Sequence, residues 1–129
     1  MELSINIEER KPIWIALSVF YLDTELQKSD FKHIALKIIE SPYSFEEVIQ
    51  INKYEVFPIL YSNLLSVSGE WSGFNEEWLI ESIASSLNSR STIKKLAIES
   101  LYTAFKWMCK SYWEELKKNY GQLNNSPDF

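Results

Sequence analysis

The segment Glu9-Arg-Lys-Pro-Ile-Trp-Ile-Ala-Leu-Ser-Val-Phe-Tyr-Leu22 decides the fold class, because its apolar residues follow the period of a helix and not the alternation of a strand. They recur at the spacing of one helix face: Ile13, Ala16, Leu17, Phe20 and Tyr21. Pro12 falls in the opening turn, where its missing N–H removes no helical hydrogen bond. The pattern predicts a first helix over residues 9–22.

The helical period returns after each polar break in the first half of the chain. Ser29-Asp30 is a predicted cap for a second helix. The apolar stripe of this helix is Phe31, Ile34, Ala35, Ile38 and Ile39. Ser44 and Glu47 have the spacing of a capping box, which predicts the start of a third helix. Pro58 lacks an N–H, so we expect this helix to kink or restart there as a short fourth helix.

The second half of the chain predicts two more helices. Asn75 is a suitable N-cap for one of them, and the polar segment 88–92 predicts a break after it. A long helix is then expected to reach Tyr120, with Gly121 ending it. The stripe of this helix is Ile93, Leu96, Ala97, Leu101, Ala104, Phe105, Met108, Tyr112 and Leu116. We therefore predict an all-α fold, a compact bundle of about five to six helices with no sheet.

Composition is that of an ordinary globular domain. The chain has 129 residues, of which 46% are hydrophobic and 24% charged. This length corresponds to about one domain, and area scaling gives burial of roughly two-thirds of the unfolded surface. We expect a single helical domain over residues 1–129, with flexible tails at 1–8 and 122–129.

Several classes of protein are excluded by simple counts. Cys109 is the single cysteine, so an internal disulfide and CxxC zinc spacings are absent and a reducing cytosol is favoured. Acidic residues precede any base at the N-terminus, which argues against a signal peptide. No apolar run approaches the roughly 18 residues of a membrane span. We expect a cytoplasmic protein without membrane association.

The charge is acidic and unevenly distributed. Lys and Arg number 13 against 18 Asp and Glu, a net charge of −5, which argues against nucleic-acid binding. Residues 1–87 hold 6 basic and 14 acidic residues, a net of −8, whereas residues 88–129 hold 7 and 4, a net of +3. Six lysines of the last helix would solvate one helix face: Lys94, Lys95, Lys106, Lys110, Lys117 and Lys118. The acidic part is suited to a basic partner.

Catalytic and metal-binding patterns are missing from the sequence. His33 is the single histidine and has no second histidine or cysteine nearby, which is a poor basis for a metal site. The serines lack a GxSxG or SxxK context, and Cys109 lies on the aromatic stripe of the last predicted helix. We predict no catalytic residue, no metal and no cofactor.

Acidic residues supply two sets of candidate binding residues. Glu46, Glu47, Glu76 and Glu77 lie in first turns of predicted helices, where they favour the helix dipole and also offer charge to a partner. Asp23, Glu25 and Glu70 fall in predicted loops beside aromatic residues, where together they would form a polar pocket for a cation.

Tryptophans supply the remaining candidates. Trp71, Phe74 and Trp78 surround a glycine-rich turn, either as a plug on the bundle or as an anchor for a protein partner. Trp107 and Trp113 point in different directions around the last predicted helix, so we expect one of them to face a partner or a second copy of the chain.

Several segments resemble an uncharacterised family of small bacterial proteins, catalogued as a domain of unknown function. The resemblance covers residues 9–83, and its most specific segments are Leu22-Asp-Thr-Glu25 and Gly69-Glu-Trp-Ser-Gly-Phe74. It implies a bacterial cytoplasmic setting and brings no catalytic residue. By type, the chain is also similar to the small acidic helical immunity proteins that accompany secreted bacterial toxins.

These observations favour a binding protein over an enzyme. Our leading hypothesis is an immunity or antitoxin-like protein that blocks a basic bacterial toxin, such as a cationic nuclease, by direct contact. The candidate contacts are Glu46, Glu47, Glu70, Trp71, Glu76 and Glu77. Two alternatives stay open: a small metal- or ligand-binding domain or enzyme using Asp23, Glu25 and Glu70, and a homodimeric module joined through the Trp107–Trp113 helix.

Overall fold

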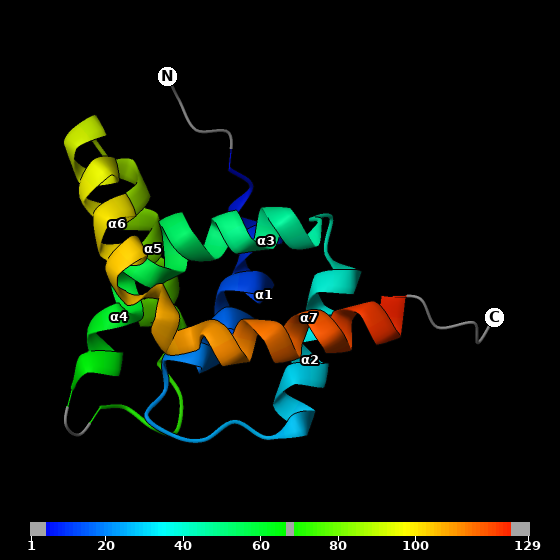
Figure 1. Cartoon of the computed structure of the whole chain (residues 1–129). Coiled ribbons are helices and arrows are strands. Elements are labelled where there is room, and N and C mark those ends of the chain that lie inside the picture. The colour runs from blue at the N-terminus through cyan, green and yellow to red at the C-terminus, as the bar shows by residue number, and fades with distance from the viewer. Residues whose placement is uncertain (1–4, 67–68, 125–129) are drawn as a thin grey trace.

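A computed structural model describes residues 5–66 and 69–124, and all regular structure in these ranges is helical (Figure 1). Within the described residues the helices join into five continuous stretches, which confirms the predicted all-α fold. The α-helices are α1 Ile7–Ser18, α2 Lys28–Glu40, α3 Phe45–Ile51, α4 Phe57–Leu65, α5 Glu76–Asn88, α6 Thr92–Phe105 and α7 Lys110–Asn124. Two short 3-10 helices, η1 Val19–Tyr21 and η3 Lys106–Cys109, follow α1 and α6. A π-helical turn, η2 Asn52–Val56, joins α3 to α4.

Helix α1 occupies the centre of the molecule (Figure 1). It packs against α2, α5 and η2. Ile13, Trp14 and Leu17 have no exposed surface at all, so the helix is covered on more than one side. Asn6 begins it, since the Asn6 side-chain oxygen accepts a hydrogen bond from the Glu9 N–H at 3.1 Å.

Helix α2 begins earlier than predicted. The predicted cap Ser29-Asp30 lies inside its first turn, and the Asp30 carboxylate reaches back to accept from the Gln27 N–H at 2.7 Å. Its apolar stripe is buried except at the last predicted residue, Ile39, which is exposed. Ile38 and Ile39 are adjacent and point about 100° apart on a helix, so only Ile38 faces the core.

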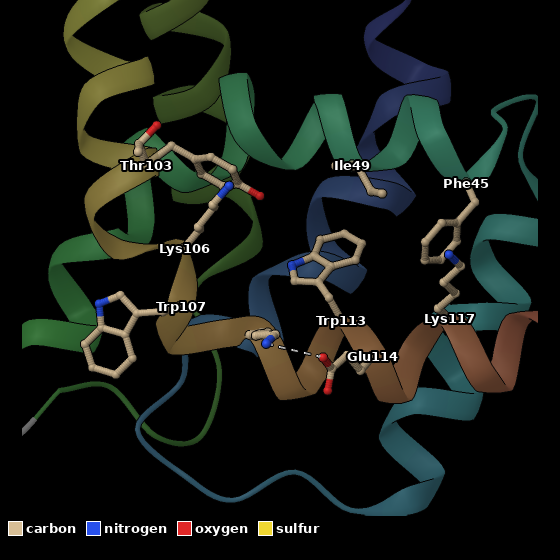
Figure 2. A pocket seen from close by; sticks show the side chains of 10 residues that line it. Phe45, Ile49, Thr103, Lys106, Trp107, Trp113, Glu114 and Lys117 are labelled. Carbon is tan, nitrogen blue, oxygen red and sulfur yellow. Dashed lines mark ion pairs between the residues drawn. The ribbon is translucent and has the colours of Figure 1, made fainter.

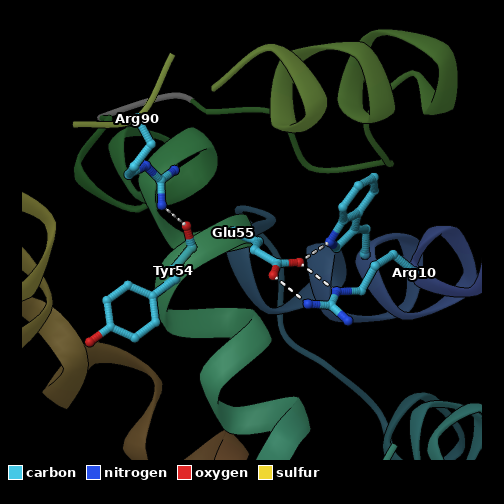
Figure 3. Close-up of polar contacts among 5 residues, drawn as sticks. Arg10, Tyr54, Glu55 and Arg90 are labelled. Carbon is cyan, nitrogen blue, oxygen red and sulfur yellow. Dashed lines mark hydrogen bonds and ion pairs between the residues drawn. The ribbon is translucent and has the colours of Figure 1, made fainter. Parts of the chain in front are cut away.

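The third and fourth helices are joined through η2, close to where the sequence predicts a restart. The capping box at the start of α3 is confirmed: Ser44 Oγ accepts from the Glu47 N–H at 3.1 Å, and Glu47 Oε1 accepts from the Ser44 N–H at 2.8 Å. Pro58 has no N–H for the carbonyl four residues earlier, that of Tyr54. The Arg90 guanidinium donates to this carbonyl at 2.8 Å instead (Figure 3).

A buried carboxylate fastens η2 to α1 (Figure 3). Glu55 is 5% exposed and accepts from Arg10 Nε at 2.9 Å, from Arg10 Nη2 at 2.8 Å and from Trp14 Nε1 at 2.8 Å. Burial by itself would lower the pKa of Arg10, but the hydrogen bonds and the charge of Glu55 raise it above its ordinary value. Both oxygens of the Glu55 carboxylate therefore accept hydrogen bonds from the bidentate Arg10 guanidinium.

The prediction of one long last helix is wrong. The break at 88–92 is confirmed, but α6 ends at Phe105 and a 3-10 turn redirects the chain into α7, which packs along α2. Because α6 packs mainly on η2, most of its predicted stripe faces solvent: Ile93 is 79% exposed, and Ile98 is buried in its place. The other residues of the predicted stripe that prove exposed are Leu96, Ala97 and Ala104.

Helical structure extends into both predicted tails. Helix α1 starts at Ile7, and α7 continues through Gly121 to Asn124, so the predicted stop at Gly121 is wrong. Gly73 is the one glycine among the described residues with a positive φ, at 144°, whereas Gly121 stays in the helix. The remaining tail residues, 1–4 and 125–129, and the loop residues 67–68 lie outside the described residues.

Replacing Glu55 by Gln should lower the free energy of unfolding by about 3 kcal/mol, because Arg10 then loses its buried counter-charge. Urea unfolding measures the loss. Glu8→Gln is the matched control: it breaks the exposed Lys11–Glu8 pair and should cost less than about 1 kcal/mol. Equal costs for the two variants would contradict a structural role for the buried pair.

Replacing Arg90 by Ala should cost about 1–3 kcal/mol, because the Tyr54 carbonyl loses a charged donor. In a Pro58→Ala background the same change should cost less, since residue 58 then carries an N–H. Unfolding of the wild type, both single variants and the double variant gives the coupling free energy. Strictly additive costs would show that Arg90 does not replace the missing proline donor.

Candidate functional site

Cys109 and His33 do not form a reactive centre. Cys109 is buried, and its sulfur lies 3.7 Å from the Phe20 carbonyl oxygen. Burial raises the pKa of the Cys109 thiol to about 11, so the reactive thiolate is scarce at neutral pH. His33 lies exposed on α2. In residues 5–66 and 69–124, no three His, Cys, Asp or Glu side chains gather where they could hold a metal ion.

The predicted polar pocket of Asp23, Glu25 and Glu70 is not assembled as a metal-binding group. Asp23 and Glu70 do meet, but through the main chain: the Asp23 N–H donates to the Glu70 carbonyl at 2.7 Å. The Asp23 carboxylate accepts from the Gly69 N–H at 3.3 Å, and the Glu70 carboxylate accepts from the Ser72 hydroxyl at 3.1 Å. The contacts of Asp23 and Glu70 therefore fasten a loop.

Asn63, at the end of α4, fixes the same loop from the other side. Its Nδ2 donates to the Tyr21 carbonyl at 2.7 Å and to the Glu70 carbonyl at 3.0 Å, while its Oδ1 accepts from the Glu70 N–H at 2.8 Å. The backbone of Gly69 passes so close that a Cβ there would lie 2.8 Å from the Asn63 carbonyl oxygen. Asn63 could not be recognised from the sequence, because a single amide in a helix forms no motif.

Residues 70–78, which we call the 70–78 segment, begin at the residue that Asn63 holds. Their exposed acidic and tryptophan side chains are Glu70, Trp71, Glu76, Glu77 and Trp78. Trp71 is 67% exposed and Trp78 is 48% exposed, so neither acts as a plug on the core. Phe74 is half-buried and stacks on Trp78, with ring centroids 6.3 Å apart. The 70–78 segment therefore presents two tryptophans and three carboxylates to solvent.

The other two candidate acids lie elsewhere. Glu46 and Glu47 are in the first turn of α3, and Figure 1 shows the start of α3 well separated from the start of α5. The Glu47 carboxylate is already bonded to the Ser44 N–H. Glu70, Trp71, Glu76 and Glu77 are thus all exposed within residues 70–78, whereas Glu46 and Glu47 begin another helix.

Trp107 and Trp113 have different environments, as their angular separation predicts. Trp113 packs edge-on against Phe20 and Phe45, at centroid distances of 5.3 Å and 6.0 Å. Trp107, on η3, is 67% exposed. A homodimer through this part of the chain stays a prediction.

A groove of about 460 Å³ lies between α3, the bend from α6 into η3, and α7 (Figure 2). Its floor is largely apolar and includes Phe45, Ile49 and Trp113, and lysines stand at its edge. The groove could not be predicted from the sequence, because the single continuous last helix expected there would not turn back along α3. The bend that creates the groove depends on tertiary packing.

Replacing Gly69 by Ala should displace the loop from Asn63, because the new methyl group has no room. Amide hydrogen exchange at Asp23 and Glu70 should then become faster by about tenfold or more, as these N–H groups lose their acceptors. Gly121→Ala is the control, since a methyl group there meets no atom within 4 Å. Unchanged exchange in Gly69→Ala would contradict a fixed loop.

Comparisons with known proteins identify the family but no function. No curated protein and no solved structure matched the chain. None of the helices described is long and apolar enough to cross a membrane. One family model matches residues 8–119, which include the segments that carried the resemblance. The chain therefore belongs to the family described as a domain of unknown function (DUF7079).

Proposed function

We propose that the protein is an immunity or antitoxin-like binding protein that acts in the bacterial cytoplasm and neutralises a basic toxin by direct contact. The 70–78 segment is the proposed contact surface. The observation that carries this proposal is the exposure of Trp71 and Trp78 beside three exposed carboxylates. Tryptophan is enriched at the energetic centres of protein interfaces.

The hydrogen bonds that hold Gly69 and Glu70 support a recognition role. Asn63 and Asp23 hold the main chain of Glu70 through three hydrogen bonds, and the Asp23 carboxylate also accepts one from the Gly69 N–H. Trp71 therefore follows a fixed residue. A contact side chain on an ordered loop loses less conformational entropy on binding than one on a mobile loop. The loop is thus suited to an interface that forms without rearrangement.

Electrostatics supports a basic partner. Residues 1–87 carry a net charge of −8, and the 70–78 segment contributes three of these acids without a basic residue. Complementary potentials steer encounter and accelerate association, and the effect weakens as salt rises. A cationic nuclease has the required charge, and covering its nucleic-acid site would inhibit it.

The test begins with capture of partners from the lysate of the source bacterium on immobilised wild-type protein, identified by mass spectrometry. We expect a basic protein in equimolar amount whose expression alone arrests bacterial growth and whose co-expression with this chain does not. Glu70→Lys/Glu76→Lys/Glu77→Lys should slow its association by about tenfold or more. Trp71→Ala should accelerate its dissociation.

A matched variant separates local from overall charge. Glu8→Lys/Glu9→Lys/Glu40→Lys changes the net charge by the same amount at exposed positions away from the 70–78 segment. It should associate faster than the triple variant of the segment. Equal slowing in both variants would contradict the proposed contact surface, and a captured partner that is acidic or harmless to growth would contradict the neutralising function.

A further inference from the structure

The groove between α3 and α7 is a second feature with the properties of a binding site, and it lies apart from the 70–78 segment. Its volume of about 460 Å³ falls within the roughly 300–1,000 Å³ of small-molecule pockets. The exposed surface of its lining is mostly apolar. Such a surface is favourable for the apolar body of a ligand, because binding removes both from water.

The floor of the groove is preformed by the core. Trp113 is held edge-on between Phe20 and Phe45, and Phe45 is itself buried. Phe45 also packs against Tyr120, with ring centroids 5.0 Å apart. The aromatic floor therefore keeps its shape without a ligand, which is typical of pockets that bind small molecules.

The charge at the edge of the groove is the reverse of the charge of the whole chain. Lys106, Lys110 and Lys117 line it together with one acid, Glu114, so the edge carries a net charge of +2 in a chain of net charge −5. Glu114 pairs with Lys110 at 3.9 Å. Lys106 and Lys117 form no ion pair with any described residue.

These two unpaired lysines stand at opposite ends of the floor. Figure 2 shows Lys106 and Lys117 extending from η3 and α7 toward α3, on either side of Trp113. Their aliphatic stems extend the apolar walls and their ammonium groups remain in water. An anion bound beside either group would gain a charge-assisted hydrogen bond without a buried, unpaired charge.

We propose that this groove binds a small amphipathic anion, a single carboxylate on an apolar body such as a medium-chain alkyl group. The apolar body lies on Phe45, Ile49 and Trp113, and the carboxylate lies against Lys106 or Lys117. The size of the groove favours a small molecule over a partner helix, whose diameter of about 10–12 Å would leave most of it outside the hollow.

The test uses decanoate, below its micelle concentration, as the probe. Titration calorimetry should show saturable binding of one molecule per chain, and the NMR signal of the Trp113 indole N–H should shift during the titration. Decylammonium has a matched chain and the opposite charge, and it should bind at least about tenfold more weakly. Absence of saturable decanoate binding, or equal binding of both probes, would overturn the proposal.

Three variants locate the site. Lys106→Gln/Lys117→Gln removes two charges while keeping much of the side-chain stems, and should weaken decanoate binding by about tenfold or more. Lys28→Gln/Lys32→Gln makes the same charge change at exposed positions on α2 and should leave binding unchanged. Thr103→Phe fills the groove from an exposed position on α6 and should block binding. Equal weakening by both lysine pairs would contradict a local site.

Two further arms separate this proposal from its alternatives. An acidic amphipathic helical peptide that binds the same residues more tightly than decanoate would overturn the small-molecule assignment in favour of a partner helix. The Glu70→Lys/Glu76→Lys/Glu77→Lys variant should bind decanoate as the wild type does. Failure of either proposal is thus distinguishable from failure of the other.

Discussion

The contact between Glu55 and the pair Arg10 and Trp14 is the interaction on which the rest of the arrangement depends. It joins the central helix α1 to the π-helical turn η2, at a point where both are covered by other helices. A buried carboxylate is costly unless its oxygens are all bonded, so this geometry permits little displacement of η2 along α1. The direction in which α3 and α4 leave that turn is set accordingly.

The π-helical turn η2 also determines how the second half of the chain is arranged. Pro58 leaves the Tyr54 carbonyl without its helical donor, and Arg90 occupies that position from the connection between α5 and α6. Helix α6 then packs on η2, and the chain has to bend at η3 before α7 can lie along α2. The groove is a consequence of this bend, since α3 and α7 form its two long walls.

The two proposed binding surfaces use opposite charge and different rigid supports. The 70–78 segment is acidic and is held by the main-chain contacts of Asn63 and Asp23. The groove is basic at its edge and rests on aromatic side chains of the core. The separation of charge along the sequence, −8 in residues 1–87 and +3 in residues 88–129, thus becomes a separation of two surfaces in space.

The sequence by itself determined what depends on neighbours within a few residues. The capping box of Ser44 and Glu47, the Asn75 cap, the restart near Pro58 and the break at 88–92 were all predictable, because each rests on local hydrogen bonds or on a missing N–H. The acids and Trp71 of the proposed contact surface were selected from the sequence as residue types suited to an interface, and their role stays a prediction. Local rules also gave the helical fold class.

Tertiary structure decided whatever depends on contacts between distant segments. The bend at η3 joins two sequences that are each good helix formers, so it is set by packing of α7 on α2 and not by a breaking residue. Three other features also depend on contacts between residues that lie far apart in the sequence. They are the buried face of α6, the role of Asn63 and the pairing of Glu55 with Arg10. Periodicity marks a helix face that can be buried, but only the neighbouring helices determine which face is.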